Sequence, residues 1–417
     1  MHDLDFRLPS FDAALAGLPP APAHGVESDE AFWGAVRGLY ATSHALTNLE
    51  NGYWGVMAEP VKAMFQHWTE RVNHENTLLI REHWPRALDL LRQTVAAALG
   101  CEACEIALTR GATEAMLALI GGYNRLQPGD NVLYCDLDYP AMRYAMEWLR
   151  QRRGVVPVSF AVPEPATHDN VLEAYADMLR RHPNTRIVLL THLSHCTGLV
   201  MPVRELAALA RSAGAEVIVD AAHSWGQLDF DVRSLDAPYV AFNLHKWIGA
   251  PLGCGCLYIR NGSVSAIDPY FGDRDFPATD VRSRIHTGSP NFGAWLTIPA
   301  ALQLHQRISA HAKEMRLRSL RDHWVACART LRGIELLTPD DPSMVAGMTA
   351  FRIRGRTTPA DNEAVVAALR DSHGVFTVRR SGPAMGDVVR VTPAVYTSHA
   401  DLDRLLAGLR TLTGADS

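Results

Sequence analysis

The sequence predicts an α/β fold built on a largely parallel sheet, with a smaller α+β unit towards the C-terminal end. Strand-like and helix-like segments alternate between about residues 105 and 260. Several strand-like segments are continuously apolar, such as Thr185-Arg-Ile-Val-Leu-Leu-Thr-His192, which is typical of strands covered on both faces. Polar residues follow these strands at their carboxyl ends, which is where sheets of this kind bind ligands.

Composition narrows the class of protein. The 417 residues suffice for a large core and two domains, and the net charge of -5 is not the footprint of a protein that binds nucleic acid or an anionic membrane. No apolar run approaches the ~18 residues of a membrane span. The acidic N-terminus lacks the pattern of a signal peptide. The seven cysteines lack the spacing of a zinc site, so we expect reduced thiols, no metal and a cytoplasmic location.

The first 45 residues are expected to form an N-terminal arm and helix that join the smaller domain. Residues 1–28 are rich in Pro and Ala, which favours a segment wrapped on the surface, and Ser28 is placed to cap a helix reaching Tyr40. Helices are also expected at 60–73 and 84–99. In the intervening loop, Tyr53 and Trp54 are adjacent aromatic residues suited to lining a pocket.

The large domain is expected over residues 46–305. Its predicted strands are 105–110, 131–135, 154–160, 185–192 and 215–220, followed by the apolar stretch 240–259; its predicted helices are 111–120, 140–153, 171–182 and 202–213. Gly111 lies at the turn into the first of these helices, and Thr113 lies in its first turn. Free backbone N–H groups at a positive helix end form a phosphate site in principle, although a capped helix without a ligand has the same pattern.

Residues 306–417 are expected to form the smaller α+β domain. A long helix over 299–332 should lead into it, with strands near 347–354 and 386–392 and helices near 360–371 and 399–412. The preceding stretch, 262–300, is long and irregular, as loops with a function or an interface often are. Arginines of this domain that face the cleft are natural clamps for a carboxylate, although surface arginine is the commoner case.

Lys246 lies in the middle of the apolar stretch 240–259, where a charge is costly to bury. The chain has three lysines, Lys62, Lys246 and Lys313, against 37 arginines. Unlike arginine, a desolvated lysine can lose its proton and become a nucleophile. Taken alone, Lys246 fits equally well as a lysine that extends from a strand end to water.

The segment upstream favours a chemical role for Lys246. Ala215-Glu-Val-Ile-Val-Asp220 is a short buried strand that ends in a carboxylate, and His223 follows closely. A pyridoxal phosphate (PLP) site needs a lysine for the Schiff base and an aspartate that keeps the pyridine nitrogen protonated. The sequence therefore predicts a PLP enzyme whose catalytic residues are Lys246, Asp220 and His223.

Four motifs, in order, resemble the class V aminotransferase family of fold-type I PLP enzymes. They are Thr109-Arg-Gly-Ala-Thr-Glu-Ala115, His195-Cys-Thr-Gly198, Asp220-Ala-Ala-His223 and His245-Lys246, and the likeness extends over residues 46–412. The branch with the greatest likeness includes isopenicillin N epimerase and its relatives, among them C–S lyases. The resemblance implies a PLP-dependent transferase fold of type I with a mostly parallel seven-stranded sheet. It also implies a homodimer with a shared active site and chemistry at Cα of an amino acid substrate.

The resemblance also implies roles for individual residues. Lys246 would bond to the cofactor and later shuttle the Cα proton, Asp220 would pair with the pyridinium nitrogen, and His223 would lie near the ring. The other implied cofactor contacts are Tyr139 against the ring, His195 at the cofactor oxygen, Gly111, Ala112, Thr113 and His245 at the phosphate, and Ser289 at the phosphate of the neighbouring subunit. The implied substrate contacts are Arg390 at the α-carboxylate, with Arg379 or Arg380 as alternatives, beside Tyr53 and Trp54.

The sequence departs from the family pattern at two places. Many relatives have Asn at the position of His195. Cysteine desulfurases carry a cysteine just after the equivalent of Gly382, where this chain has Pro383-Ala-Met-Gly386, so a persulfide-forming desulfurase is disfavoured. Epimerisation, C–S lysis and transamination stay open, and the likeness to the epimerase branch favours Cα proton chemistry. A non-catalytic protein of the same fold would have lost Lys246 or Asp220, and a dinucleotide-binding protein would carry a Gly-x-Gly-x-x-Gly turn after a strand.

Overall fold

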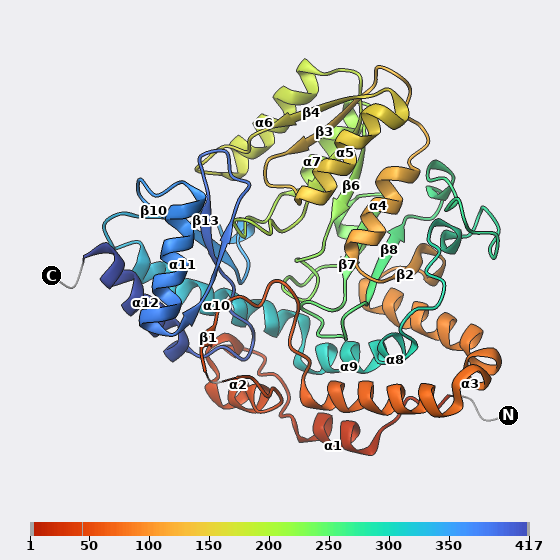
Figure 1. Ribbon diagram of the computed structural model, residues 1–417, viewed down its shortest axis with the longest axis horizontal. Helices are drawn as coiled ribbons and strands as arrows, with labels where there is room; N and C mark the ends of the chain where they lie inside the picture. The colour runs from red at the N-terminus through yellow and green to blue at the C-terminus, as the bar shows by residue number, and fades with distance from the viewer. Residues whose placement is uncertain (1–3, 44, 415–417) are drawn as a thin grey trace.

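A seven-stranded sheet forms the centre of the molecule in the computed structural model, which describes residues 4–43 and 45–414 (Figure 1). The strand order is β2-β8-β7-β6-β5-β3-β4. Neighbours from β4 to β7 pair in parallel, whereas β8 runs antiparallel to both β7 and β2. The strands are β2 Ile106–Thr109, β3 Asn131–Cys135, β4 Val156–Phe160, β5 Thr185–Thr191, β6 Glu216–Asp220, β7 Tyr239–Asn243 and β8 Gly255–Ile259. The predicted α/β class and mostly parallel sheet are confirmed.

Helices cover both faces of this sheet, because successive strand residues point to opposite sides. In β5, Ile187 and Leu189 pack into a core with α4 Ala112–Gly122 and α5 Pro140–Arg153. Their neighbours Val188 and Leu190 pack into a second core on the other face. That core includes residues of α3 Glu59–Leu99, α6 His168–Arg181, α7 Val203–Ser212, α8 Phe292–Leu296 and α9 Ile298–Ile308. The continuously apolar strands are thus buried from both sides.

A four-stranded antiparallel sheet lies on the C-terminal side, in the order β12-β13-β10-β9. Its strands are β9 Ile334–Leu336, β10 Thr349–Ile353, β12 Val378–Arg380 and β13 Val388–Val391, and its helices are α10 Ala310–Ala328, α11 Pro359–His373 and α12 His399–Thr413. Trp324, Phe351, Leu369 and Leu405 share a separate core there. β1 Thr47–Asn48 and β11 Val375–Phe376 form a separate two-stranded parallel sheet. The loop that follows β1 therefore starts beside the C-terminal part of the chain.

The N-terminal segment contacts both the helices beside the seven-stranded sheet and the C-terminal part of the chain. Helix α1 Pro9–Gly17 lies against α3 and α9, whereas α2 Glu30–Arg37 ends with Arg37 donating a hydrogen bond to the Tyr396 carbonyl. The division into domains at residues 45 and 305 stays a prediction. Short 3-10 helices complete the secondary structure at Val26–Ser28, Ala103–Glu105, Val232–Leu235, Val264–Ala266, Val281–Arg284 and Pro342–Met344.

Four expected helices differ in detail. The helix expected over 299–332 is two helices, because Ser309 has a positive φ of 82° and its side chain caps α10. The helices expected at 60–73 and 84–99 are joined in one run, interrupted by non-helical angles at Asn76. Asp29, rather than Ser28, caps α2: its carboxylate accepts from the Phe32 amide, while Ser28 sits in the preceding 3-10 turn.

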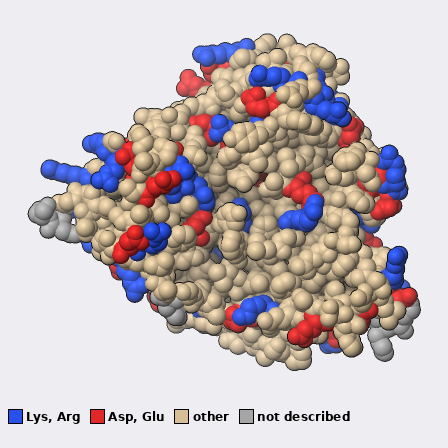
Figure 2. Space-filling view, viewed as in Figure 1, with Lys and Arg blue, Asp and Glu red and all other residues tan. Residues whose placement is uncertain are grey.

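The surface has no extended region of one charge on the face that Figure 2 shows. Acidic and basic side chains are interspersed there, and the surface is hollowed near its centre. Among the described residues, none of the helices is both long enough and apolar enough to span a membrane.

Candidate active site

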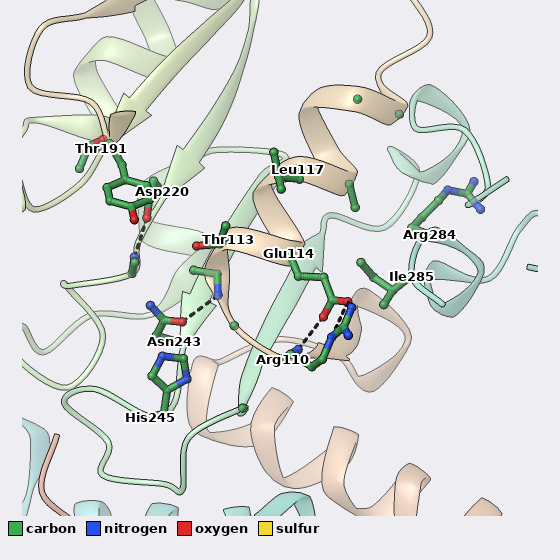
Figure 3. A pocket seen from close by; sticks show the side chains of 18 of the residues that line it. Arg110, Thr113, Glu114, Leu117, Thr191, Asp220, Asn243, His245, Arg284 and Ile285 are labelled. Carbon is green, nitrogen blue, oxygen red and sulfur yellow. Dashed lines mark hydrogen bonds and ion pairs between the residues drawn. The ribbon is translucent and has the colours of Figure 1, made fainter. Parts of the chain in front are cut away.

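A cavity of about 1070 Å³ opens beyond the carboxyl ends of the parallel strands. The last residues of β5, β6 and β7 line it, namely Thr191, Asp220 and Asn243 (Figure 3). Arg380 of β12 and Arg390 of β13 line it from the second sheet. The sheet therefore brings polar groups together beyond the carboxyl ends of its parallel strands, where such sheets bind ligands.

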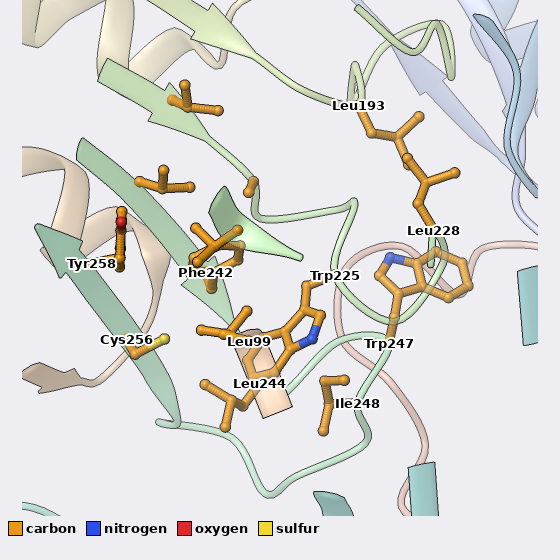
Figure 4. Close-up of a cluster of buried hydrophobic side chains, with 14 of the residues drawn as sticks. Leu99, Leu193, Trp225, Leu228, Phe242, Leu244, Trp247, Ile248, Cys256 and Tyr258 are labelled. Atoms are coloured by element: carbon orange, nitrogen blue, oxygen red, sulfur yellow. The ribbon is translucent and has the colours of Figure 1, made fainter. Parts of the chain in front are cut away.

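Lys246 is held at this cavity by the backbone around it. The Gly55 amide donates to the His245 carbonyl at 2.9 Å, and a Cβ at Gly55 would lie 1.9 Å from the Lys246 carbonyl oxygen. On the other side, Leu244 and Trp247 pack into the apolar cluster of Figure 4 with Phe242. The backbone of Lys246 is thereby held in place, with Leu244 before it and Trp247 after it anchored in the core.

The Lys246 amine shares a hydrogen bond of 2.8 Å with Nε2 of His223. Burial lowers the pKa of Lys246 from 10.5 to about 7; Asp220 opposes this shift, and Arg390 adds to it. Burial also lowers the pKa of His223 well below its usual value, and the nearby lysine charge adds to that effect. Near neutral pH the Lys246 amine is therefore partly neutral and can act as a base, while His223 is neutral and holds the amine through this hydrogen bond.

Asp220 ends β6, and its Oδ1 accepts a hydrogen bond from the Ala222 amide at 2.9 Å. Burial raises the pKa of this carboxyl, and the Ala222 amide and Lys246 partly oppose the rise. A buried carboxylate of this kind is stabilised by a cation placed against it. A protonated pyridine nitrogen is such a cation.

The N-terminus of α4 supplies the anion-binding part. Gly111 precedes the helix, and a Cβ there would lie 3.1 Å from Asn243 Oδ1 and from His245 Cε1, so glycine permits this close approach. Ala112 donates its amide to Asn243 Oδ1 at 2.7 Å, while Thr113 lines the cavity. His245 lies within 2.8 Å of the Cys254 carbonyl through Nδ1, and burial lowers its pKa to about 4.

Tyr139 and His195 form the opposite wall. Their rings meet edge to face with centroids 5.2 Å apart, and both residues line the cavity. The next residue, Cys196, is buried, and burial raises the pKa of its thiol to about 12. None of the seven cysteines lines the cavity, so the site offers no thiolate to a substrate.

The structure does not bring every predicted residue to the cavity. Arg379 is engaged outside it by Glu363 and Asp387, and Trp54 packs edge to face on Tyr53 without being among the described lining residues. Tyr53 does line the cavity. Ser289 is exposed and lies outside the lining set, and its expected role at a neighbouring subunit stays a prediction.

Asn243 and Glu50 are the site residues that the sequence analysis missed. Asn243 is a polar residue at the end of an apolar strand, and that signal resembles the one that identified Asp220. Glu50 lies in the same loop as Tyr53 and carries no comparable signal. Its carboxylate accepts hydrogen bonds from Arg380 and Arg390.

These residues suit PLP. An amine, a strand-end carboxylate and a helix N-terminus face one cavity, as the aldehyde, the ring nitrogen and the phosphate of that cofactor require. In addition, Nδ1 of His223 is buried without a hydrogen-bond partner among the described residues. An unpaired buried polar atom is costly, and a ligand atom in the cavity can satisfy it.

Comparison with protein families identifies one match across most of the chain. The model of class V aminotransferases matches residues 58–405. The isopenicillin N epimerase of Streptomyces clavuligerus is 26% identical over 400 residues, which cover 92% of this chain and 99% of that protein. A cysteine desulfurase of Pectobacterium atrosepticum is 27% identical, over 78% of this chain and 82% of that protein.

Solved structures have the same fold. A C-DES variant with glycine covalently linked to its PLP cofactor superposes with a TM-score of 0.79 at 23% identity, covering 89% of this chain and 98% of that one. The cysteine desulfurase CsdA of Escherichia coli gives a TM-score of 0.76 at 21% identity, covering 92% and 98%.

Proposed function

The chain belongs to the class V aminotransferase family and is a PLP-dependent enzyme, and on this premise we propose that it epimerises an amino acid or amino-acid-derived substrate at Cα. The hydrogen bond of 2.8 Å between Lys246 and His223 carries the proposal, since it holds a buried amine with a lowered pKa in place at the cavity, where it can act as a base. The likeness to two isopenicillin N epimerases supports the reaction type.

The proposed roles follow from the geometry. When bound, PLP supplies an electron sink that weakens the bonds at Cα. Lys246 would hold the cofactor, and its neutral amine would take and return the Cα proton at Nζ, with His223 holding the amine through the hydrogen bond. Asp220 would stabilise the positive charge of the ring nitrogen. Thr191 pairs with Asp220 across the sheet and also lines the cavity.

The remaining lining residues position the two ends of the bound molecules. Gly111, Ala112, Thr113 and His245 would bind the phosphate, with Asn243 as an added contact, because the amides of a helix N-terminus attract anions. Tyr139 and His195 would face the ring. Arg380 and Arg390 would bind the substrate carboxylate, since guanidinium groups form charge-assisted hydrogen bonds with carboxylates. Tyr53 would face the substrate side chain.

Deuterium exchange tests the reaction type. The enzyme is incubated in deuterated water with L- and D-amino acids and S-substituted cysteines, and the products are analysed by mass and chirality. Deuterium at Cα with inversion supports epimerisation. Pyruvate with a released thiol would instead establish a C–S lyase, and a keto acid formed only with an acceptor would establish an aminotransferase. A persulfide relay is disfavoured, because no cysteine lines the cavity.

We further propose that the enzyme is a homodimer whose sites borrow Ser289 from the partner. Exposed apolar side chains at the cavity mouth support it, since such groups usually mark an interface: Leu117, Trp148, Leu252, Tyr270 and Phe271. An active monomer in sedimentation velocity would contradict the proposal.

The absence of a disulfide among the seven cysteines supports a reducing location such as the cytoplasm.

A further inference from the structure

Glu50 joins the two arginines that line the cavity. Both of its carboxylate oxygens lie 2.7 Å from Arg390 Nη2, and Oε1 also accepts from Arg380 Nη2 at 2.9 Å. The Glu50 side chain is 8% exposed and that of Arg390 is 1% exposed, so water screens this contact little. Glu50 itself is not among the described residues that line the cavity. The two arginines therefore line the cavity, and the Glu50 carboxylate lies behind them, in contact with both.

The backbone holds Glu50 in this place. Its amide donates to Asn48 Oδ1, and the residue pairs in parallel with Thr392. The Thr392 amide donates to the Leu49 carbonyl at 2.7 Å, so the loop is anchored on both sides of Glu50. A Cβ at Gly52 would lie 2.6 Å from Arg390 Nη2, so glycine at 52 allows the loop to lie against the guanidinium. Displacing Glu50 would leave Arg390 buried without a counter-ion, which is strongly unfavourable.

The donors left for a ligand belong mainly to Arg380. Arg390 uses Nη1 on the His195 carbonyl at 2.5 Å and Nη2 on Glu50. Arg380 uses Nη2 on Glu50, and its side chain is 24% exposed. The Nε atoms of both arginines are buried without a partner among the described residues. Nη1 of Arg380 is thus the main donor left for a ligand carboxylate, beside a second guanidinium that is already engaged.

The charges of this cluster sum to one positive unit, since two guanidinium groups face one carboxylate. The other titratable groups whose charges act on these arginines or on the histidines beside them are Arg143, His195, Cys196, His223 and Lys246. The arginines themselves help to keep both histidines neutral, in addition to burial. One net positive charge matches one carboxylate and leaves a second anionic group without a partner.

We propose that Glu50 is a specificity-determining residue: as the resident counter-ion of Arg380 and Arg390, it restricts this end of the site to a substrate with a single carboxylate. A dicarboxylate or phosphate end is discriminated against because its second charge is desolvated without compensation. The inference rests on the proposed amino acid substrate and adds to it the charge of the substrate end.

The test compares binding of acetate and malonate to the holoenzyme by titration calorimetry. The measured quantity is the ratio of the two dissociation constants, acetate over malonate. Glu50→Gln raises the net charge to two, and we expect the ratio to rise about tenfold, since a unit charge acts strongly at such distances. Glu50→Asp keeps the charge and should stay within about threefold of the wild type, although its shorter side chain reaches the arginines less well.

Two further variants distinguish an effect of the net charge of this cluster from an effect of misfolding. Glu50→Gln combined with Arg380→Gln returns the net charge to one and should return the ratio to the wild-type value. Arg380→Gln alone lowers the charge to zero and should lower the ratio, so the proposal stays testable if Glu50→Gln does not fold. Glu363→Gln is the matched control, because it removes the partner 3.2 Å from Arg379 outside the cavity and should leave the ratio unchanged.

A ratio in Glu50→Gln within twofold of the wild-type value would overturn the proposal, as would an unchanged ratio in Arg380→Gln. These outcomes are independent of the proposed reaction. An enzyme with the expected anion selectivity but no deuterium exchange at Cα with any amino acid would refute the epimerase function and leave the role of Glu50 intact. Deuterium exchange at Cα without the expected change of the ratio in Glu50→Gln would support the epimerase function and refute the role of Glu50.

Discussion

Replacing Lys313 tests how burial sets the charge of a lysine in this fold. Lys313 lies on α10, is 5% exposed, and donates a hydrogen bond to the Trp247 carbonyl at 2.5 Å. Its amine also lies 3.1 Å from Nδ1 of His305. No carboxylate compensates it among the described residues, and burial lowers its pKa from 10.5 to about 7. In a chain that uses arginine almost everywhere, this position holds a lysine, which unlike arginine can become neutral when it is buried.

The magnitude follows from proton linkage. Because the folded pKa lies below the unfolded one, the unfolded chain binds more protons here, and the free energy of unfolding rises with pH. This contribution is fully present only above 10.5 and is lost as the pH falls to about 7. Its slope is at most about 1.4 kcal/mol per pH unit, which gives roughly 1.6 kcal/mol between pH 7 and 8.5 once partial protonation near pH 7 is included.

The assay is urea unfolding of the cofactor-free protein, followed by tryptophan fluorescence at several pH values in that range. Lys313→Met should flatten the rise in unfolding free energy by the stated amount, whatever its effect on stability at a single pH. Lys62→Met is the control, because Lys62 is 41% exposed and paired with Glu59 at the surface, and it should leave the slope as in the wild type. An unchanged slope in Lys313→Met would show that Lys313 keeps its proton when folded, which would refute the reasoning from burial.

The other predictions concern the site. Lys246→Ala should abolish cofactor trapped by borohydride, whereas Lys313→Met should retain it because Lys313 does not line the cavity; mass spectrometry of the reduced proteins distinguishes them. Asp220→Ala should lower turnover about 100-fold and weaken cofactor binding far less, and full turnover would disprove its role. Gly55→Ala should fold, as circular dichroism would show, yet bind PLP about tenfold more weakly, because its Cβ would meet the Lys246 carbonyl; normal loading would contradict this.

The positions of Lys246, Asp220 and His223 were predictable because their signal is local. Each lies at or just after an apolar strand, and the carboxyl ends of parallel strands meet at one edge. The strand and helix pattern was predictable for the same reason, since periodicity depends on near neighbours. The exceptions are local events of backbone geometry, such as the positive φ at Ser309 that divides the expected long helix.

The contacts of Asn243 and Glu50 were decided only by the tertiary structure. Asn243 meets an amide 131 residues away, and Glu50 meets an arginine 340 residues away. No periodicity links such positions, so their partners depend on how the two sheets pack. Likewise, the sequence favoured Arg390 and left Arg379 and Arg380 as alternatives, whereas the fold engages Arg379 outside the cavity and places Arg380 and Arg390 in its lining. The sequence by itself determined the fold class and the position of Lys246 just after an apolar strand, because those follow from local polarity. The charge that faces the substrate follows from long-range packing, which only the folded chain defines.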